Sequence, residues 1–337
     1  MKHYFLLLIT IALAQTTIAQ NSLTSHTLKG HQASVTHAKF SKNGQWLISA
    51  DKNNVIKVWD VITSECIQTI QKPQKRILDL TISATGGLIA ASSVDKTVRV
   101  WFSNTGKLIF QKKIGYATDL QFNPQNEYQL LISKNTDKLN PLGLLVGQVS
   151  TFKVGVIQLW NIYSKKKISQ TKIRQNVRCL DFDPKGRYVV TADNANKLSF
   201  TNIQHNLYLK SIQQNDRITQ VKFGPEGKYI AISNQYNKIR IFSIDNGNLF
   251  KTIQLSAHAH LIRFTPDNKY LIIVDQNQHI QVHPFLSKKQ FSRKVNYSQI
   301  KDVFVKTKGV LTVQIGQNQE DIILKSYHEL FQTTHNI

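Results

Sequence analysis

The sequence contains few cysteines and few acidic residues. Only Cys66 and Cys179 occur among 337 residues, so a disulfide framework cannot be the main source of stability. Asp and Glu number 20 against 43 Lys and Arg, which gives a formal net charge of +23 at pH 7. A chain with so little negative charge favours acidic partners or anionic polymers, but its charge says nothing about its fold.

Long apolar runs are also scarce. The run FLLLITIALA, residues 5–14, follows Lys2 and precedes Ala19. It is too short for a membrane-spanning helix, which needs about 20 residues, and it has the pattern of a secretory signal peptide. A buried N-terminal helix is the alternative. We therefore expect a signal peptide over residues 1–19 and an exported protein, periplasmic or secreted, with no membrane span.

A turn motif recurs along the whole chain. In one copy, Asp183-Pro184-Lys185-Gly186, proline pre-sets the first central position, while Asp and Gly suit the outer positions of the turn. The residues before successive turns are separated by 42, 40, 60, 41, 41 and 41 positions. These residues are Phe40, Ile82, Phe122, Phe182, Phe223, Phe264 and Val305. The regular spacing indicates seven repeats of about 41 residues, one of which carries an insertion.

The sequence around each turn is typical of short strands. Flanks such as VKFGPEGKYIAIS alternate with period two, and a third apolar stretch, as in VIKVWD and VRVWF, follows at a constant offset. A fourth stretch precedes the next repeat. Such thin units bury both faces only by standing against neighbours in a ring. The pattern predicts an all-β fold: a seven-bladed β-propeller of four-stranded antiparallel sheets, formed by residues 20–337.

Two stretches carry motifs of a known family. Residues 27–61 contain Gly30-His31, FSKNG and VIKVWD, and residues 76–107 contain SSVDKTVRVW and an NTGK turn. These motifs resemble those of the WD-repeat β-propeller family. The resemblance covers nearly all of residues 20–337 and weakens from residue 162 onward. It implies a non-catalytic scaffold for protein–protein interaction.

In that family a His, a Ser or Thr, an Asp and a strand Trp form a hydrogen-bonded group within a blade. Carried over to the matching positions, this group would involve His31, Asn53 and Trp59 in the first repeat, and Ser93, Asp95 and Trp101 in the second. The first repeat has Asn in place of Asp, and the second lacks the His. No repeat has the full set, so we expect packing rather than this network to hold the ring together.

The resemblance also implies that the ring closes with a strand from the N-terminus. Residues 22–28 precede the first repeat as a fourth strand would, although LFQTTH from Leu330 competes for the same place. In this arrangement Cys66 lies on an outermost strand and Cys179 on an innermost strand of a distant blade. A disulfide needs Cα atoms within about 7 Å. Both thiols are therefore expected to be free.

The insertion at residues 134–153 falls between the second and third strands of blade three. These turns and the connections between blades share one face of the ring, called here the upper face. The insertion contains apolar residues next to glycines. Leu142, Leu144 and Leu145 are among these apolar residues. It either binds a partner or folds back over the ring opening. The sequence does not separate these interpretations.

The opposite, lower face is expected to collect lysines at its hairpin turns. Two clusters stand out: Lys165, Lys166 and Lys167, and Lys288 and Lys289. Single lysines fall on the other turns. A face of this kind could bind an anionic polymer, a glycan or a nucleic acid, by counterion release. A solvated surface that keeps the protein soluble is the alternative.

Four residues precede first strands near the upper opening and are candidate partner contacts: Arg76, Arg217, His258 and His260. No carboxylate or cysteine near the two histidines completes a metal-ligand set. We therefore expect neither a metal nor another cofactor.

Two functions compete. The first is a monomeric, non-catalytic scaffold that binds another protein, with binding of an anionic polymer as its alternative. The second, less favoured, is a lactonase-like propeller hydrolase. Inner strands offer Asp79, Asp119 and Asp181 for a metal, but the neighbouring copies carry Lys39, Lys222 and Arg263. A ring of mixed charge is a poor site for a hard cation, and no catalytic motif is present. The sequence therefore predicts that the protein is not an enzyme.

Overall fold

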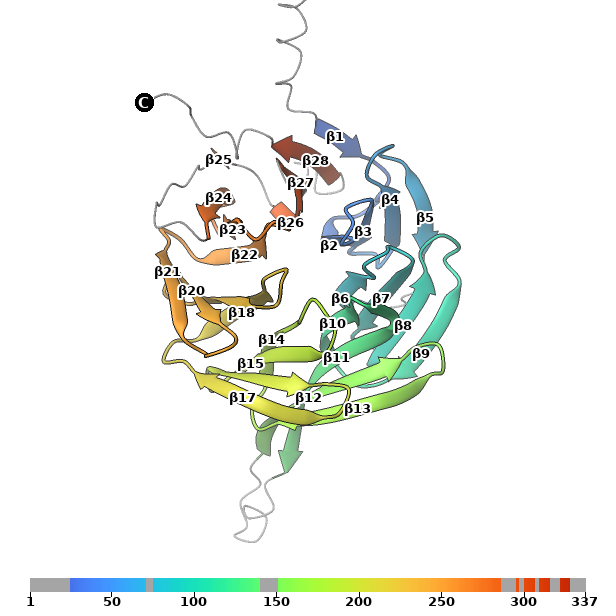
Figure 1. The fold of residues 1–337 in the computed structure, drawn as a ribbon. Helices are drawn as coiled ribbons and strands as arrows, with labels where there is room; N and C mark the ends of the chain where they lie inside the picture. Colours follow the sequence, from blue (N-terminus) through green and yellow to red (C-terminus); the bar gives the residue numbers. More distant parts are fainter. Residues whose placement is uncertain are drawn as a thin grey trace, which may run out of the picture.

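The computed structural model describes residues 25–70, 75–139, 151–285, 295–296, 300–306, 309–315 and 322–327. In these ranges the regular elements are strands, which pair antiparallel in seven sheets of four. The sheets stand side by side around a central opening (Figure 1). We number them as blades in the order of their inner strands.

The first three blades are each formed by four consecutive strands. Blade one contains β2 (Val35–Phe40), β3 (Trp46–Asp51), β4 (Ile56–Asp60) and β5 (Cys66–Ile70). Blade two contains β6 (Ile77–Ile82), β7 (Leu88–Ser93), β8 (Thr97–Phe102) and β9 (Leu108–Lys113). Blade three contains β10 (Ala117–Asn123), β11 (Asn126–Leu139), β12 (Thr151–Asn161) and β13 (Lys166–Ile173).

The next three blades repeat this order. Blade four contains β14 (Val177–Phe182), β15 (Tyr188–Asp193), β16 (Lys197–Asn202) and β17 (Leu207–Gln213). Blade five contains β18 (Ile218–Phe223), β19 (Tyr229–Asn234), β20 (Lys238–Ser243) and β21 (Leu249–Gln254). Blade six contains β22 (Ala259–Phe264), β23 (Tyr270–Asp275), β24 (His279–Pro284) and β25 (Val295–Asn296).

Blade seven joins the two ends of the chain. It contains β26 (Ile300–Lys306), β27 (Gly309–Ile315) and β28 (Ile322–Tyr327), and its outer strand is β1 (Ser25–Leu28). β1 pairs with β28 from Ser25↔Lys325 to Leu28↔Ile322. The N-terminal strand therefore closes the ring, as predicted. The competing segment from Leu330 lies outside the described residues.

The prediction of a seven-bladed propeller of four-stranded sheets requires a correction. Six sheets have four strands of at least four residues, whereas the outer strand of blade six, β25, has two residues and pairs with β24 at two positions. The sequence after β24, SKKQFSRK, lacks the apolar alternation of the other outer strands. The described ring therefore consists of six complete blades and one blade whose outer strand is reduced.

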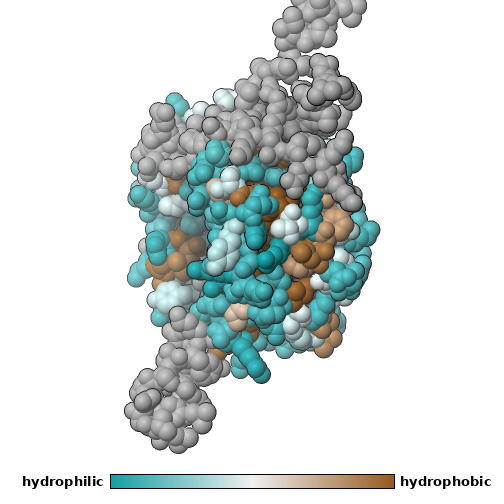
Figure 2. Space-filling view, turned by 90° about the vertical axis from the view of Figure 1, so that its left-hand side faces the viewer, coloured by the Kyte–Doolittle hydropathy of each residue, from teal (hydrophilic) through white to brown (hydrophobic). Residues whose placement is uncertain are grey.

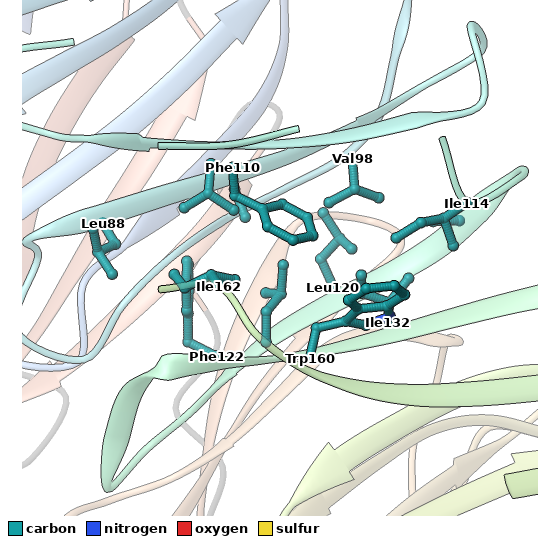
Figure 3. Close-up of a cluster of buried hydrophobic side chains, with 13 residues drawn as sticks. Leu88, Val98, Phe110, Ile114, Leu120, Phe122, Ile132, Trp160 and Ile162 are labelled. Carbon is teal, nitrogen blue, oxygen red and sulfur yellow. The ribbon is translucent and has the colours of Figure 1, made fainter. Parts of the chain in front are cut away.

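Burial follows the position of each strand within its blade. The second strands are almost wholly buried, as in β7, because a neighbouring blade covers each of their faces. Outer strands such as β17 are largely exposed. Between blades two and three, Phe110 and Trp160 pack edge to face with ring centroids 5.9 Å apart (Figure 3). Burial of each such ring contributes about 2–3 kcal/mol.

The insertion extends blade three beyond the ring. β11 and β12 pair without interruption from Gln129↔Asn161 to Leu139↔Thr151, so the insertion begins as a long hairpin. The described ends of this hairpin run outside the outline of the ring and not across its opening (Figure 1). Residues 140–150, with Leu142, Leu144 and Leu145, lie outside the described residues.

Both cysteines are free, as predicted. Cys66 is exposed on the outer strand β5, and Cys179 lies on the inner strand β14 of blade four. Burial raises the pKa of the Cys179 thiol to about 12. No helix of the described chain is long and apolar enough to cross a membrane.

Candidate functional site

The inner strands share an irregularity that directs side chains toward the ring axis. Each inner strand has a register shift after its first paired residue, as between Ile77 and Asp79 in β6. A bulge of this kind bends the strand and changes the direction of a side chain. The residues that follow the shift are His37, Asp79, Asp119, Cys179, Gln220, Leu261 and Asp302.

Three ion pairs link blades near the axis. Lys39 Nζ lies 2.9 Å from Asp79 Oδ1, Lys222 Nζ lies 2.8 Å from Asp181 Oδ1, and Arg263 Nη2 lies 3.1 Å from Asp302 Oδ1. The second oxygen of each carboxylate accepts a backbone N–H from an adjacent blade, namely that of Leu120, Phe223 or Phe40. These aspartates therefore serve to join blades.

Asp119 differs from the other axial aspartates because no cation lies within ion-pair distance of it in the described residues. Burial, followed by the charge of Asp79, raises the pKa of Asp119 to about 7. Lys39 and Lys222 act in the opposite direction from further away. Within the described part of the chain, no group of three or more His, Cys, Asp or Glu residues has the arrangement of a metal site.

The four candidate residues near the upper opening occupy matching corners of the ring. Arg76, Arg217 and His258 each precede an inner strand, and their carbonyls accept the N–H of Val94, Gln235 and Gln276, respectively. Arg76, Arg217 and His260 are exposed, and His258 is half-buried. Arg217 and the two histidines belong to adjacent blades five and six, whereas Arg76 lies across the ring in blade two (Figure 1).

Sequence reasoning missed a third arginine on this rim. Arg178, the second residue of β14, donates from Nε to Asn194 Oδ1 at 2.6 Å. Burial, followed by the charge of Arg217, lowers the pKa of Arg178. The two guanidinium groups therefore lie close enough to interact, which concentrates positive charge on one part of the rim. Their positions beside the first residues of neighbouring inner strands, Val177 and Ile218, are the signal that could have identified the pair.

The lower face carries the predicted lysines at its turns. Lys165, Lys166 and Lys167 are exposed where β12 turns into β13. Single exposed lysines occupy the turns of other blades: Lys42, Lys107, Lys185, Lys228 and Lys269. Lys288 and Lys289 lie outside the described residues.

Blade one contains a complete hydrogen-bonded group. His31 lies 2.9 Å from Asp51 Oδ2 through Nδ1 and 2.7 Å from Ser49 Oγ through Nε2, while Trp59 Nε1 donates to Ser49 Oγ at 2.8 Å. All four side chains are buried. Burial is also the main reason why the pKa of His31 is lowered, although the hydrogen bond that its ring donates to Asp51 opposes this shift.

This arrangement corrects the assignment of the acidic member of the hydrogen-bonded group in blade one. Asn53 is exposed, and Asp51 at the end of β3 takes the place expected for it. The statement that no blade has the full set is therefore wrong for blade one. The signal was present in the sequence, because a polar residue stands eight positions before the aligned third-strand residue in several blades: Asp51, Ser93, Asp193, Asn234 and Asp275.

Blade two lacks the group. Trp101 is fully buried, but its Nε1 has no hydrogen-bond partner. The position that corresponds to Ser49 is Ala91, which has no side-chain oxygen. Asp95, assigned to the group by resemblance, holds its own turn instead: despite burial, hydrogen bonds from Arg99 and Thr97 lower its pKa to about 2. Ser93 donates to the Lys75 carbonyl.

The unpaired indole N–H of Trp101 leads to a testable prediction. Ala91→Ser should place a hydroxyl beside Trp101 Nε1, as Ser49 does for Trp59, and raise the free energy of unfolding by about 1 kcal/mol. Urea denaturation measures this change, and Ala90→Ser, on the opposite face of β7, is the control because it buries a hydroxyl without offering it to Trp101. An Ala91→Ser protein that is no more stable than the Ala90→Ser protein would contradict the assignment.

Comparison with known proteins follows the distribution of the motifs. The family model "WD domain, G-beta repeat" matches residues 23–60 and 64–101, and "Anaphase-promoting complex subunit 4 WD40 domain" matches residues 204–266. A third model, "Eukaryotic translation initiation factor eIF2A", matches residues 131–210.

Several curated proteins are similar to parts of the chain. Elongator complex protein 2 of Saccharomyces cerevisiae is 37% identical over 98 residues, which is 28% of this chain and 12% of that protein. Eukaryotic translation initiation factor 3 subunit I of Neurospora crassa is 32% identical over 82 residues, 24% of each chain. Nuclear distribution protein PAC1 of Arthroderma otae is 25% identical over 179 residues, 48% of this chain and 38% of that protein. The chain thus spans well under two thirds of these relatives.

A solved structure has the same fold. The β-propeller domain of Cps50 (Swd1) from Myceliophteria thermophila superposes with a TM-score of 0.69 at 12% identity, and the match covers 89% of this chain and 99% of that one. Identity this low supports the fold alone.

The comparisons contradict the predicted location. The relatives are eukaryotic proteins named for translation initiation and for nuclear distribution. Translation initiation takes place inside the cell, so the prediction of a periplasmic or secreted protein is wrong. Its basis, the apolar run within residues 1–19, lies outside the described residues.

Proposed function

The chain belongs to the WD-repeat β-propeller family, and from that premise we propose that it is a non-catalytic scaffold that binds another protein through the upper rim of its ring. The broad statement, a propeller that mediates protein–protein interaction, agrees with the relatives. Two of them are named as a subunit or as a component of a complex. The sites on this chain and its partner are our proposal.

One observation carries the choice of the upper rim: exposed side chains that form no hydrogen bond or ion pair in the described residues occur on both sides of its opening. Arg76, Arg217 and His260 are exposed, and their side chains form no hydrogen bond or ion pair within the described residues. The axial lysines and arginine, by contrast, are paired with aspartates. Arginine in exposed, unpaired positions is typical of interaction surfaces, because its planar group binds carboxylates with two hydrogen bonds.

A pull-down from an extract of the source cells tests this proposal. The double variant Arg76→Glu/Arg217→Glu should recover the bound partner at a level about tenfold lower than the unmodified protein, because each reversal replaces an attraction with a repulsion. Lys107→Glu/Lys165→Glu, which makes the same charge change on the lower face, is the matched control. Equal losses in both variants would assign the effect to net charge, and equal recovery in all samples would remove the upper rim from the proposal.

The lower face supports a second candidate, the binding of an anionic polymer. The exposed lysines of its turns carry this candidate, since each could contact a phosphate or carboxylate group. Apart from the cluster of Lys165, Lys166 and Lys167, these lysines occur singly on separate turns instead of forming a continuous track. We therefore rank this candidate below the scaffold.

A further inference from the structure

Two pockets on the lower face lie next to each other. The first, called here the mouth pocket, has a volume of about 400 Å³ and includes Phe40, Lys42, Phe223, Phe264 and Val303 in its lining. The second, the inter-blade pocket, lies between blades four and five, has a volume of about 460 Å³ and is lined in part by Tyr188, Phe200, Leu209 and again Phe223. Because Phe223 lines both, the two pockets adjoin at this side chain, and we refer to them together as the groove. The mouth pocket lies where inner strands end, and the inter-blade pocket reaches Leu209 on the outer strand β17.

The groove has an apolar floor. Phe200 and Phe223 meet edge to face with centroids 6.5 Å apart. Beyond them, Leu209 is 45% exposed at the outer end, beside Tyr208 and Leu207 on the same strand. Exposed apolar residues also occur on the outer strand of the adjacent blade, where Leu249 and Phe250 belong to β21. Figure 2 faces the side that carries β21 and shows such hydrophobic residues as separate patches within a largely hydrophilic surface.

The charges along the groove are not balanced. Most of its carboxylates have partners: Asp302 pairs with Arg263, Glu226 with Lys228, and Asp183 accepts the N–H groups of its own turn. Of the lining residues, Lys42 and Lys185 are exposed without a carboxylate partner in the described residues, and Lys210 donates only to the carbonyl of Ile244. Among the carboxylates that line the groove, only Asp245 has no cation within ion-pair distance in the described residues.

From this combination we propose that the groove binds an acidic peptide segment of a protein partner, with apolar side chains seated in the two pockets and carboxylates near Lys42 and Lys185. Each pocket falls in the size range of natural ligand sites, which are mostly apolar with a few polar groups. The formal net charge of +23 attracts acidic segments over a distance. The proposal rests on the scaffold function but concerns a different face from the upper rim.

A peptide fits the groove better than a nucleic acid. Phe200 and Phe223, two of the aromatic residues that line it, pack edge to face against each other and do not form open platforms for stacked bases. The cations without carboxylate partners are few and stand at the sides of the pockets, which suits isolated carboxylates better than a continuous row of phosphates.

Fluorescence anisotropy with a labelled peptide of sequence EEFEDLEE tests the site on the full chain. We expect binding that weakens about tenfold for Leu209→Asp and about tenfold for Lys42→Glu/Lys185→Glu, because a lost apolar anchor or two reversed charges each remove roughly one unit of log affinity. The matched controls are Leu108→Asp, an exposed leucine on the outer strand β9, and Lys107→Glu/Lys165→Glu. These should leave the affinity within about twofold. Circular dichroism verifies that each variant is folded.

Three results would overturn the site: equal weakening by the control variants, equal binding of the peptide EESEDSEE without apolar residues, or tighter binding of a single-stranded polynucleotide that Leu209→Asp does not affect. The last would identify the lower face as a polyanion site. The upper-rim proposal is tested independently of the groove, because Arg76→Glu/Arg217→Glu should not alter the binding of EEFEDLEE. Loss of cellular partners in that variant with no peptide binding would support the scaffold and reject the groove.

Discussion

Replacing His31 with alanine is expected to lower the free energy of unfolding by about 3 kcal/mol. The substitution removes the hydrogen-bond partner of a buried carboxylate, Asp51, and of a buried hydroxyl, Ser49, and leaves a cavity. A hydrogen bond to a charged group contributes about 1.5–3 kcal/mol, and an unsatisfied buried group adds to the loss. Urea denaturation measures the change.

The control for this prediction is His260→Ala. His260 is exposed and its ring forms no hydrogen bond in the described residues, so its removal should change stability by no more than about 0.5 kcal/mol. If His31→Ala were as stable as His260→Ala, the polar group of blade one would contribute nothing to folding. The sequence-based expectation that packing, and not this polar network, holds most of the ring together would then apply to this blade as well.

Acidification is expected to destabilise the protein through His283. This residue occupies, in blade six, the strand position that Trp59 holds in blade one, and it is buried with Nε2 3.1 Å from Gln281 Oε1. Burial, followed by the positive charge of Lys251, lowers its pKa from 6.5 to about 4. The unfolded chain therefore takes up a proton between pH 6.5 and about 4 that the folded chain does not.

The sign of the effect follows from this difference. The contribution of His283 is fully present above pH 6.5, decreases as the pH falls, and is lost below about pH 4. It amounts to roughly 2–3 kcal/mol after allowance for partial solvent access. Thermal unfolding at pH 7 and at pH 5 measures it, as the part of the change in melting temperature that depends on His283.

A variant isolates this residue from the other titrating groups. Asp119 acts in the opposite direction, because its pKa is raised to about 7 and its protonation stabilises the fold as the pH falls. His283→Gln keeps a polar side chain but cannot titrate, so its difference in melting temperature between pH 7 and pH 5 should be smaller than that of the unmodified protein. Identical pH dependence in the two proteins would contradict the role of His283.

Some functional positions were predictable because they depend on local chemistry. The turns, the free cysteines and the lower-face lysines follow from the repeat, since a residue at a given position in a period of about 41 occupies the same place in each blade. The groove was not predictable in this way. Its pockets join residues as distant in the sequence as Phe40 and Phe264, and the charge left on it depends on which lysines pair with carboxylates.

The sequence alone determined that this chain forms short antiparallel strands in repeats that stand in a ring, because apolar alternation and turn chemistry act between neighbouring residues and repeat along the chain. Only the tertiary structure decided that Asp51 and not Asn53 binds His31, that Trp101 has no partner, and that blade six has a reduced outer strand. Those outcomes depend on how side chains from separate strands meet when sheets pack face to face. No local pattern determines such distances.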